Sequence, residues 1–158
     1  MKEASSNEFE IIPFVGFGKL RFGMTPEDVA SIAGKPSIVD KGYLGDRVEY
    51  RHDNAVVSYD KVFNTVIHFG FGPKIDASFK GKRIFQMQES EALFLLAQED
   101  GSPYECLGSI FFLKLGMALS EFHGEYIDDS DKAISMYNED GIQREVDGLD
   151  LKPFLFAK

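Results

Sequence analysis

Histidine and cysteine are the side chains of this sequence best suited to nucleophilic or acid–base chemistry, and they are few. The histidines are His52, His68 and His123, and the single cysteine is Cys106. A nucleophile needs an adjacent base and a third group that orients the base, and no local motif pairs Cys106 with a histidine. His68 lies in the alternating segment 65–69, which is typical of a strand face. We therefore predict no catalytic residues and no enzymatic activity.

Metal and phosphate sites are not predicted either. The segment 128–131 resembles the start of a calcium-binding loop, but Ala133 or Ile134 stands where that loop requires glycine. Two Gly-Phe-Gly segments, 16–18 and 70–72, lack the remaining residues of nucleotide-binding loops. We expect no metal and no cofactor, and we expect the phenylalanine of each segment to pack on the core where a strand ends.

Negative charge is concentrated in one stretch. The chain has 17 Lys and Arg against 26 Asp and Glu, a net charge of −9, and residues 121–150 hold ten acids against two bases, a net of −8. Such a segment repels phosphate backbones and attracts basic partners. It predicts a protein partner rather than nucleic acid. A solvated acidic face that only keeps the protein soluble is the alternative.

Within this stretch, acids that steer a partner and tyrosines that become buried against it are the candidate partner-binding residues. They are Tyr126, Asp128, Asp129, Asp131, Tyr137, Glu139 and Asp140. Tyrosines in a β domain also act as half-buried packing residues, so that interpretation stays open for Tyr126 and Tyr137.

Length and composition are those of one compact domain. The 158 residues are 44% hydrophobic and include 15 Phe, enough for a single core. The segment 1–8 is polar, no run of 18 apolar residues occurs, and one cysteine excludes an intramolecular disulfide. We expect a cytoplasmic protein that does not enter the membrane, with Cys106 as a buried free thiol.

The clearest local signal marks a helix between residues 25 and 34. Thr25 suits the N-cap, Pro26 suits the first helical position, and the acids at 27 and 28 favour the positive end of the helix dipole. Apolar residues at 29, 32 and 33 share one helix face. Gly34 can adopt the left-handed conformation that ends a helix.

Strand patterns follow this helix, and the second half of the chain repeats the order. Strands are expected at 47–50, 55–59 and 65–69, with a hairpin turn at 52–54. A second helix at 89–98 precedes strands at 109–113 and 134–137, turns at 140–141 and 147–148, and a last apolar segment at 149–156.

These elements predict an α+β fold in which short helices pack on antiparallel sheet. We expect a disordered tail at 1–10 and two tandem, diverged helix-plus-meander units at 11–80 and 81–158 within one compact domain. The two helices would leave a broad, partly exposed sheet surface.

The segment 20–36 resembles a known signature, apolar-x-x-Gly-Met-Thr-x-x-x-Val followed by Gly-x-Pro. It is shared by beta-lactamase inhibitory protein-like domains and small barrel-assembly lipoprotein-like domains. Gly23, Met24, Thr25, Val29, Gly34 and Pro36 match it. The resemblance implies helices packed on an antiparallel sheet, doubled in the inhibitor, and a surface presented to another protein.

In two respects the sequence departs from that family. In the second half, Gln86 and Gln88 replace the glycine and the threonine. The relatives are exported, whereas a cytoplasmic location is expected here, so neither a beta-lactamase nor the barrel machinery is the expected partner.

By analogy with the family, the expected function is that of an immunity protein, which neutralises a cognate toxin by occluding it. The acidic charge favours a basic, nuclease-type toxin. Two alternatives stay open: a non-inhibitory scaffold or assembly module that uses an exposed sheet face, and an enzyme whose site, such as a pair of carboxylates, is assembled from scattered residues.

Overall fold

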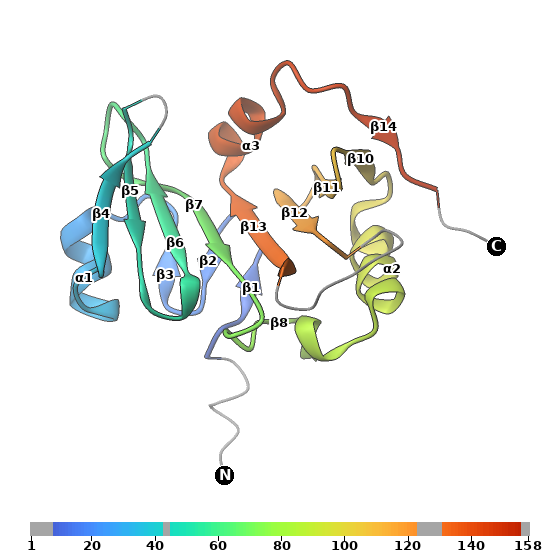
Figure 1. The fold of residues 1–158 in the computed structure, drawn as a ribbon, viewed down its shortest axis with the longest axis horizontal. Coiled ribbons are helices and arrows are strands. Elements are labelled where there is room, and N and C mark those ends of the chain that lie inside the picture. Colours follow the sequence, from blue (N-terminus) through green and yellow to red (C-terminus); the bar gives the residue numbers. More distant parts are fainter. Residues whose placement is uncertain (1–7, 43–44, 123–130, 156–158) are drawn as a thin grey trace, which may run out of the picture.

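A computed structural model describes residues 8–42, 45–122 and 131–155. The described chain has the predicted α+β architecture, with three α-helices, a nine-stranded antiparallel sheet and two small sheets (Figure 1).

The large sheet has the strand order β14-β10-β11-β12-β13-β7-β6-β5-β4, and all neighbours run antiparallel. Its strands in the first half are β4 (Ile38–Lys41), β5 (Arg47–Tyr50), β6 (Val56–Tyr59) and β7 (Val66–Phe71). Those in the second half are β10 (Tyr104–Cys106), β11 (Ser109–Phe112), β12 (Met117–Ser120), β13 (Ala133–Tyr137) and β14 (Lys152–Pro153).

Two meanders, β4 to β7 and β10 to β13, meet at the centre of this sheet (Figure 1). Strand β7 pairs with β13, so that Phe71 lies opposite Ile134 and His68 lies opposite Tyr137. Each meander follows one helix in the chain, α1 (Pro26–Ala33) or α2 (Glu89–Asp100). The order of elements therefore repeats, while descent from a duplicated unit, with the boundaries given above, stays a prediction.

Helix α1 (Pro26–Ala33) begins and ends where the sequence predicts. The Thr25 hydroxyl accepts a hydrogen bond from the Asp28 N–H, and the Asp28 carboxylate accepts one from the Thr25 N–H, both at 3.2 Å. Gly34 ends the helix with a φ of 82°. Val29 is fully buried, but Ile32 is exposed, so the predicted apolar face is narrower than expected.

Helix α2 (Glu89–Asp100) confirms the second predicted helix. Helix α3 (Glu139–Val146) corrects the turn predicted at 140–141. The Asn138 side chain caps α3 by accepting a hydrogen bond from the Gly141 N–H at 2.7 Å. A Cβ atom on Gly141 would lie 2.7 Å from the Ile67 carbonyl oxygen, so glycine is needed there for close packing rather than for a turn.

The small sheets complete the first half and the linker between the halves. They comprise β1 (Ile11–Ile12), β2 (Gly16–Phe17) and β3 (Leu20–Arg21), and separately β8 (Ser78–Phe79) and β9 (Lys82–Arg83). Short 3₁₀ helices occur at His52–Asn54 and Ile84–Gln86. Phe9 stacks on Phe17 and Glu10 bridges to Ser78, which corrects the tail expected at 1–10 for these two residues.

One face of the large sheet forms the core with α1, α2 and the strands β1 and β2. Both predicted core phenylalanines are buried there. The rings of Phe17 and Phe71 stack in parallel, 4.1 Å apart between centroids and 10° apart in plane. This contact joins the small N-terminal sheet to the central strand β7. No helix within the described residues is long and apolar enough to cross a membrane.

Replacement of Phe17 by alanine tests this contact. Phe17→Ala removes a buried ring that packs against Phe9 and Phe71, so the free energy of unfolding should fall by about 3–5 kcal/mol in a denaturant titration. The matched control is Phe63→Ala, because Phe63 is 78% exposed, and its effect should stay below about 0.5 kcal/mol. Equal effects of the two substitutions would contradict the described packing.

Candidate functional site

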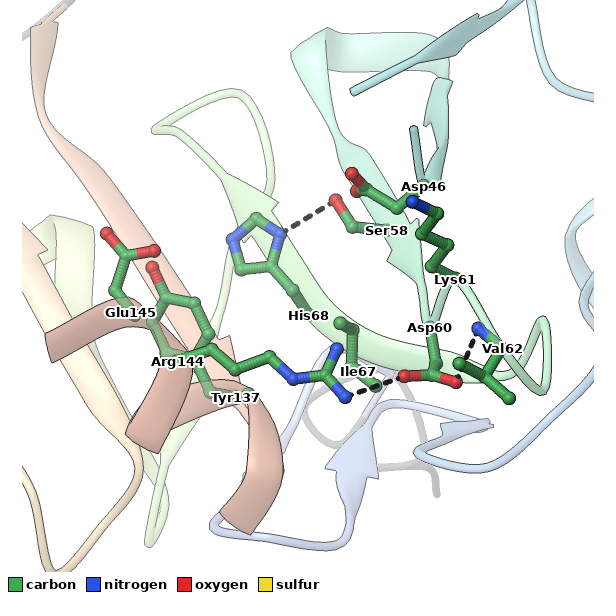
Figure 2. A pocket seen from close by; sticks show the side chains of 11 residues that line it. Asp46, Ser58, Asp60, Lys61, Val62, Ile67, His68, Tyr137, Arg144 and Glu145 are labelled. Carbon is green, nitrogen blue, oxygen red and sulfur yellow. Dashed lines mark hydrogen bonds and ion pairs between the residues drawn. The ribbon is translucent and has the colours of Figure 1, made fainter. Parts of the chain in front are cut away.

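A cleft of about 540 Å³ opens where the two meanders join (Figure 2). The first meander and its loops supply Asp46, Ser58, Asp60, Lys61, Val62, Ile67 and His68, and the end of β13 with α3 supplies Tyr137, Gly141, Arg144 and Glu145. The cleft is thus built by both halves of the chain, on the sheet face opposite the main core.

A β-bulge in β7 shapes this cleft. Ser58 pairs with His68 and Tyr59 pairs with Val66, which leaves Ile67 as an extra residue. The Ile67 carbonyl accepts a hydrogen bond from the Asn138 N–H at 3.2 Å, so the bulge also holds the start of α3. Because the alternation of side chains breaks here, Ile67 and His68 both line the cleft.

His68 and its neighbours form the polar floor. The Nδ1 atom of His68 lies 3.2 Å from the Ser58 hydroxyl, and the imidazole packs on the Tyr137 ring at a centroid distance of 4.8 Å. Burial lowers the pKa of His68 to about 4, so the imidazole is neutral near pH 7. Its other ring nitrogen faces away from Ser58, on the side of Tyr137 and Glu145 (Figure 2).

The Ser58–His68 pair differs from a nucleophile and its base. A pKa of about 4 makes His68 a weak base at neutral pH. No carboxylate within the described residues forms a hydrogen bond to the other ring nitrogen, which is where an orienting group would act. The pair is better suited to hydrogen bonding with a bound group.

Asp60 organises one rim of the cleft. Its Oδ2 atom accepts hydrogen bonds from the N–H groups of Val62 and Phe63 at 2.9 and 2.7 Å, and its Oδ1 atom pairs with Arg144 at 2.9 Å. These contacts, led by the Phe63 N–H, hold the pKa of Asp60 below its usual range. The β6–β7 loop is therefore tied to α3 by a buried charge.

The tip of that loop carries two exposed apolar side chains. Val62 is 76% exposed and Phe63 is 78% exposed, although the backbone around them is fixed by the bonds to Asp60. Leaving such residues in water on an ordered loop costs free energy unless they contact a partner. Val62 lines the cleft, so the apolar tip and the polar floor are continuous.

Glu145 closes the opposite side of the cleft (Figure 2). Within the described residues no Lys, Arg or His side chain forms an ion pair with it. Although Glu145 keeps contact with solvent, partial burial raises the pKa of its carboxyl group. Burial, followed by the nearby charge of Glu145, raises the pKa of the Tyr137 hydroxyl.

A second polar cluster surrounds Glu49, which is fully buried. Its carboxylate pairs with Arg47 and Arg51 at 2.9 and 2.8 Å and accepts a hydrogen bond from the Tyr59 hydroxyl at 2.9 Å. Arg51 also donates to the Gly34 carbonyl oxygen at 2.9 Å. Because each partner belongs to the fold, this cluster ties α1 to β5 and β6 rather than forming an open site.

Cys106 is a free thiol, as predicted, but it is half-buried rather than buried. It lines a shallow hollow of about 590 Å³ beside the turn between β10 and β11. No group of three or more metal-ligating side chains occurs in the described part of the chain.

The predicted partner-binding residues have separate positions. Tyr126, Asp128 and Asp129 lie outside the described residues, and Asp131 is exposed just before β13. Glu139 and Asp140 are exposed in the first turn of α3, while Tyr137 is buried in the cleft wall. Among the four that the structure describes, Tyr137 alone lines the cleft, and a role in partner binding stays a prediction for all seven.

The other cleft residues were not predicted as site residues, since the residue patterns of β6 and β7 are those of ordinary strands. One local signal was present: the segment from Asp60 to Asn64 places two apolar residues between turn formers, which is unusual for a hairpin loop.

A scan of the sequence against protein-family models gives no match, and searches of curated proteins and of solved structures give none either.

The pKa of His68 leads to a test of the cleft. The unfolded chain binds a proton near pH 6.5 and the folded protein only near pH 4, so the free energy of unfolding should fall as the pH decreases through this window. His68→Asn should remove that part of the decrease when urea midpoints are compared at about pH 7.5 and about pH 4.5. His52→Asn, at an exposed position, is the control and should retain it. A wild-type pH dependence in His68→Asn would show that the imidazole is not buried.

Proposed function

We propose that this chain is a protein-binding inhibitor, an immunity protein that neutralises a cognate toxin in the cytoplasm by occluding it. A basic, nuclease-type toxin is the favoured partner. The proposal assigns no catalytic role to the chain. The resemblance of 20–36 to beta-lactamase inhibitory protein-like domains remains part of this proposal, and it supports the kind of function rather than the partner.

The observation that carries the proposal is the exposed apolar pair Val62 and Phe63 on an ordered loop. Burying a Val or Phe side chain contributes roughly 1.5–3 kcal/mol each. The loop is ordered by Asp60 before any partner arrives, which lowers the entropy lost on binding. An aromatic anchor that becomes fully buried against a partner, as Phe63 would, is typical of the few residues that dominate binding energy.

Charge supports a basic partner. The chain carries a net charge of −9, and Glu139 and Asp140 are exposed at the end of α3 nearest β13. An acidic surface accelerates association with a basic protein and disfavours nucleic acid as a competitor. In the proposed complex the acids set the rate of association and the apolar loop sets the rate of dissociation.

One observation favours the assembly-module alternative. Strand β4 is an edge of the large sheet and is exposed along its length. Ile38 and Val39 are 60% and 48% exposed on opposite faces of that strand. An unprotected edge strand can add a strand from another protein. This alternative uses a surface distinct from the cleft and its loop, so the two can be separated by substitution.

The loop substitution Val62→Ser with Phe63→Ser tests the leading proposal. The tagged chain is co-expressed with the protein encoded beside it, and we expect a complex and loss of that protein's toxicity. The double variant should weaken the complex at least about tenfold, because two buried anchors are lost. Its melting temperature should change by less than about 2 °C, since both side chains are exposed in the free protein.

The control for this test is Leu107→Ser, because Leu107 is 95% exposed in the turn between β10 and β11. It should leave the affinity unchanged. A complex that survives the loop substitutions but fails when Ile38 and Val39 are replaced by serine would favour the assembly module. Absence of any complex or protection would count against the inhibitor.

Electrostatic steering is tested by replacing Asp128, Asp129 and Asp131 with asparagine. The rate of association should fall and its dependence on salt should flatten, while the rate of dissociation stays nearly constant. Stopped-flow measurements at several ionic strengths follow both rates. An unchanged association rate would remove the acidic segment from the proposed mechanism.

A further inference from the structure

We propose that the cleft between the two meanders receives an arginine side chain of the partner, with Glu145 as its counter-ion. This inference rests on the proposed protein-binding function and adds to it a chemical class of ligand for one defined site.

The cleft holds a carboxylate that the fold does not neutralise. Glu145 is exposed at the rim of the cleft, whereas the buried acid of the cleft, Asp60, is satisfied by Arg144 and by two N–H groups. Asp46 lines the wall that also holds Lys61 (Figure 2). Glu145 stands on the opposite side without an ion pair among the described residues. An incoming cation would therefore gain a charge-assisted contact that the free protein lacks.

The groups around Glu145 match a guanidinium better than an ammonium ion. A guanidinium presents five N–H donors in one plane and needs several acceptors around it. Glu145 offers two carboxylate oxygens, Tyr137 a hydroxyl that remains protonated, and the neutral His68 a ring nitrogen. The Ser58 hydroxyl hydrogen-bonds to the Nδ1 atom of His68. Because a hydroxyl can donate or accept, this bond is compatible with either tautomer of the imidazole, and the tautomer sets which ring nitrogen accepts.

An anionic ligand is disfavoured by the same geometry. Arg144 and Lys61 are the basic residues that line the cleft. Arg144 is engaged by Asp60, and three acids line the cleft against these two bases. Partial burial raises the pKa of the Glu145 carboxyl group, and an added anion would raise this pKa further.

The position of the cleft suits a ligand that belongs to a protein. Val62 lines the cleft and Phe63 follows it at the exposed tip. A basic residue flanked by apolar surface on the partner would occupy the cleft while the tip is buried beside it. Apolar cover around the ion pair excludes water and strengthens it.

The test uses the free, full-length chain and needs no partner. N-acetyl-arginine methylamide is titrated into the protein, and backbone amide shifts of Ser58, His68 and Gly141 are followed by NMR. We expect weak, saturable binding and a fall in the pKa of Glu145. Glu145→Gln should weaken binding at least about tenfold, because one charge-assisted hydrogen bond is lost. Glu27→Gln, exposed in the first turn of α1 and outside the cleft lining, should bind within about twofold of wild type.

Three probe molecules make the outcome independent of how the variants fold. The citrulline analogue of the ligand has nearly the same shape without the charge, and binding equal to that of arginine would overturn the proposal. So would equal binding of the lysine analogue, or stronger shifts of the same amides by inorganic phosphate. If arginine does not bind while the Val62 and Phe63 substitutions still break the complex, this inference fails and the proposed function stands.

Discussion

The antiparallel pairing of β7 with β13 is the constraint on which the rest of the structure depends. It joins two four-stranded meanders into one sheet and sets His68 opposite Tyr137. On one face, Phe71 and Ile134 are paired across this seam and contribute to the common core. On the other face, the same pairing opens a cleft whose walls come from different halves of the chain. The core and the candidate site are therefore two faces of a single strand pair.

Two buried carboxylates hold neighbouring elements of the fold in place, each in a different way. Glu49 is surrounded by Arg47, Arg51 and the Tyr59 hydroxyl and links helix α1 to the sheet. Asp60 orders the loop that carries Val62 and Phe63 and links it to α3. Buried ion pairs add little net stability, since desolvation offsets the attraction, but they penalise alternative arrangements that separate the partners. Their contribution here is to hold specific elements in place.

Two different kinds of interaction would contribute to the free energy of binding at the candidate surface. Removing the apolar tip from water would contribute favourable binding free energy. The acceptors in the cleft would contribute only if the partner supplied a donor of matching geometry. A partner that supplies both would bind with an affinity and a specificity that neither provides alone. This combination supports the proposed inhibitor more directly than the acidic segment does, because charge at long range mainly changes the rate of association.

Local chemistry determined much of the fold from the sequence itself. The Thr25 cap, Pro26 and Gly34 define α1 because capping bonds and glycine conformation act within a few residues. Alternation located β5, β6 and β7, and the two Gly-Phe-Gly segments located core rings. Strands β4 and β12 were not predicted, since β4 is exposed throughout and β12 is buried on both faces, so neither has a period of two. Strand β10 was not predicted either, since its three residues are all half-buried and too few to show alternation.

Only the tertiary structure decided the site. The hydrogen bond from the Asn138 N–H to the Ile67 carbonyl, the close approach of Gly141 to Ile67 and the ion pair of Asp60 with Arg144 join residues that are far apart in the chain. No local pattern encodes such contacts, because each depends on the register between β7 and β13. The sequence by itself determined the α+β class, the starts of α1 and α2 and the acidic charge, while the pairing of the two meanders decided which side chains share a cleft.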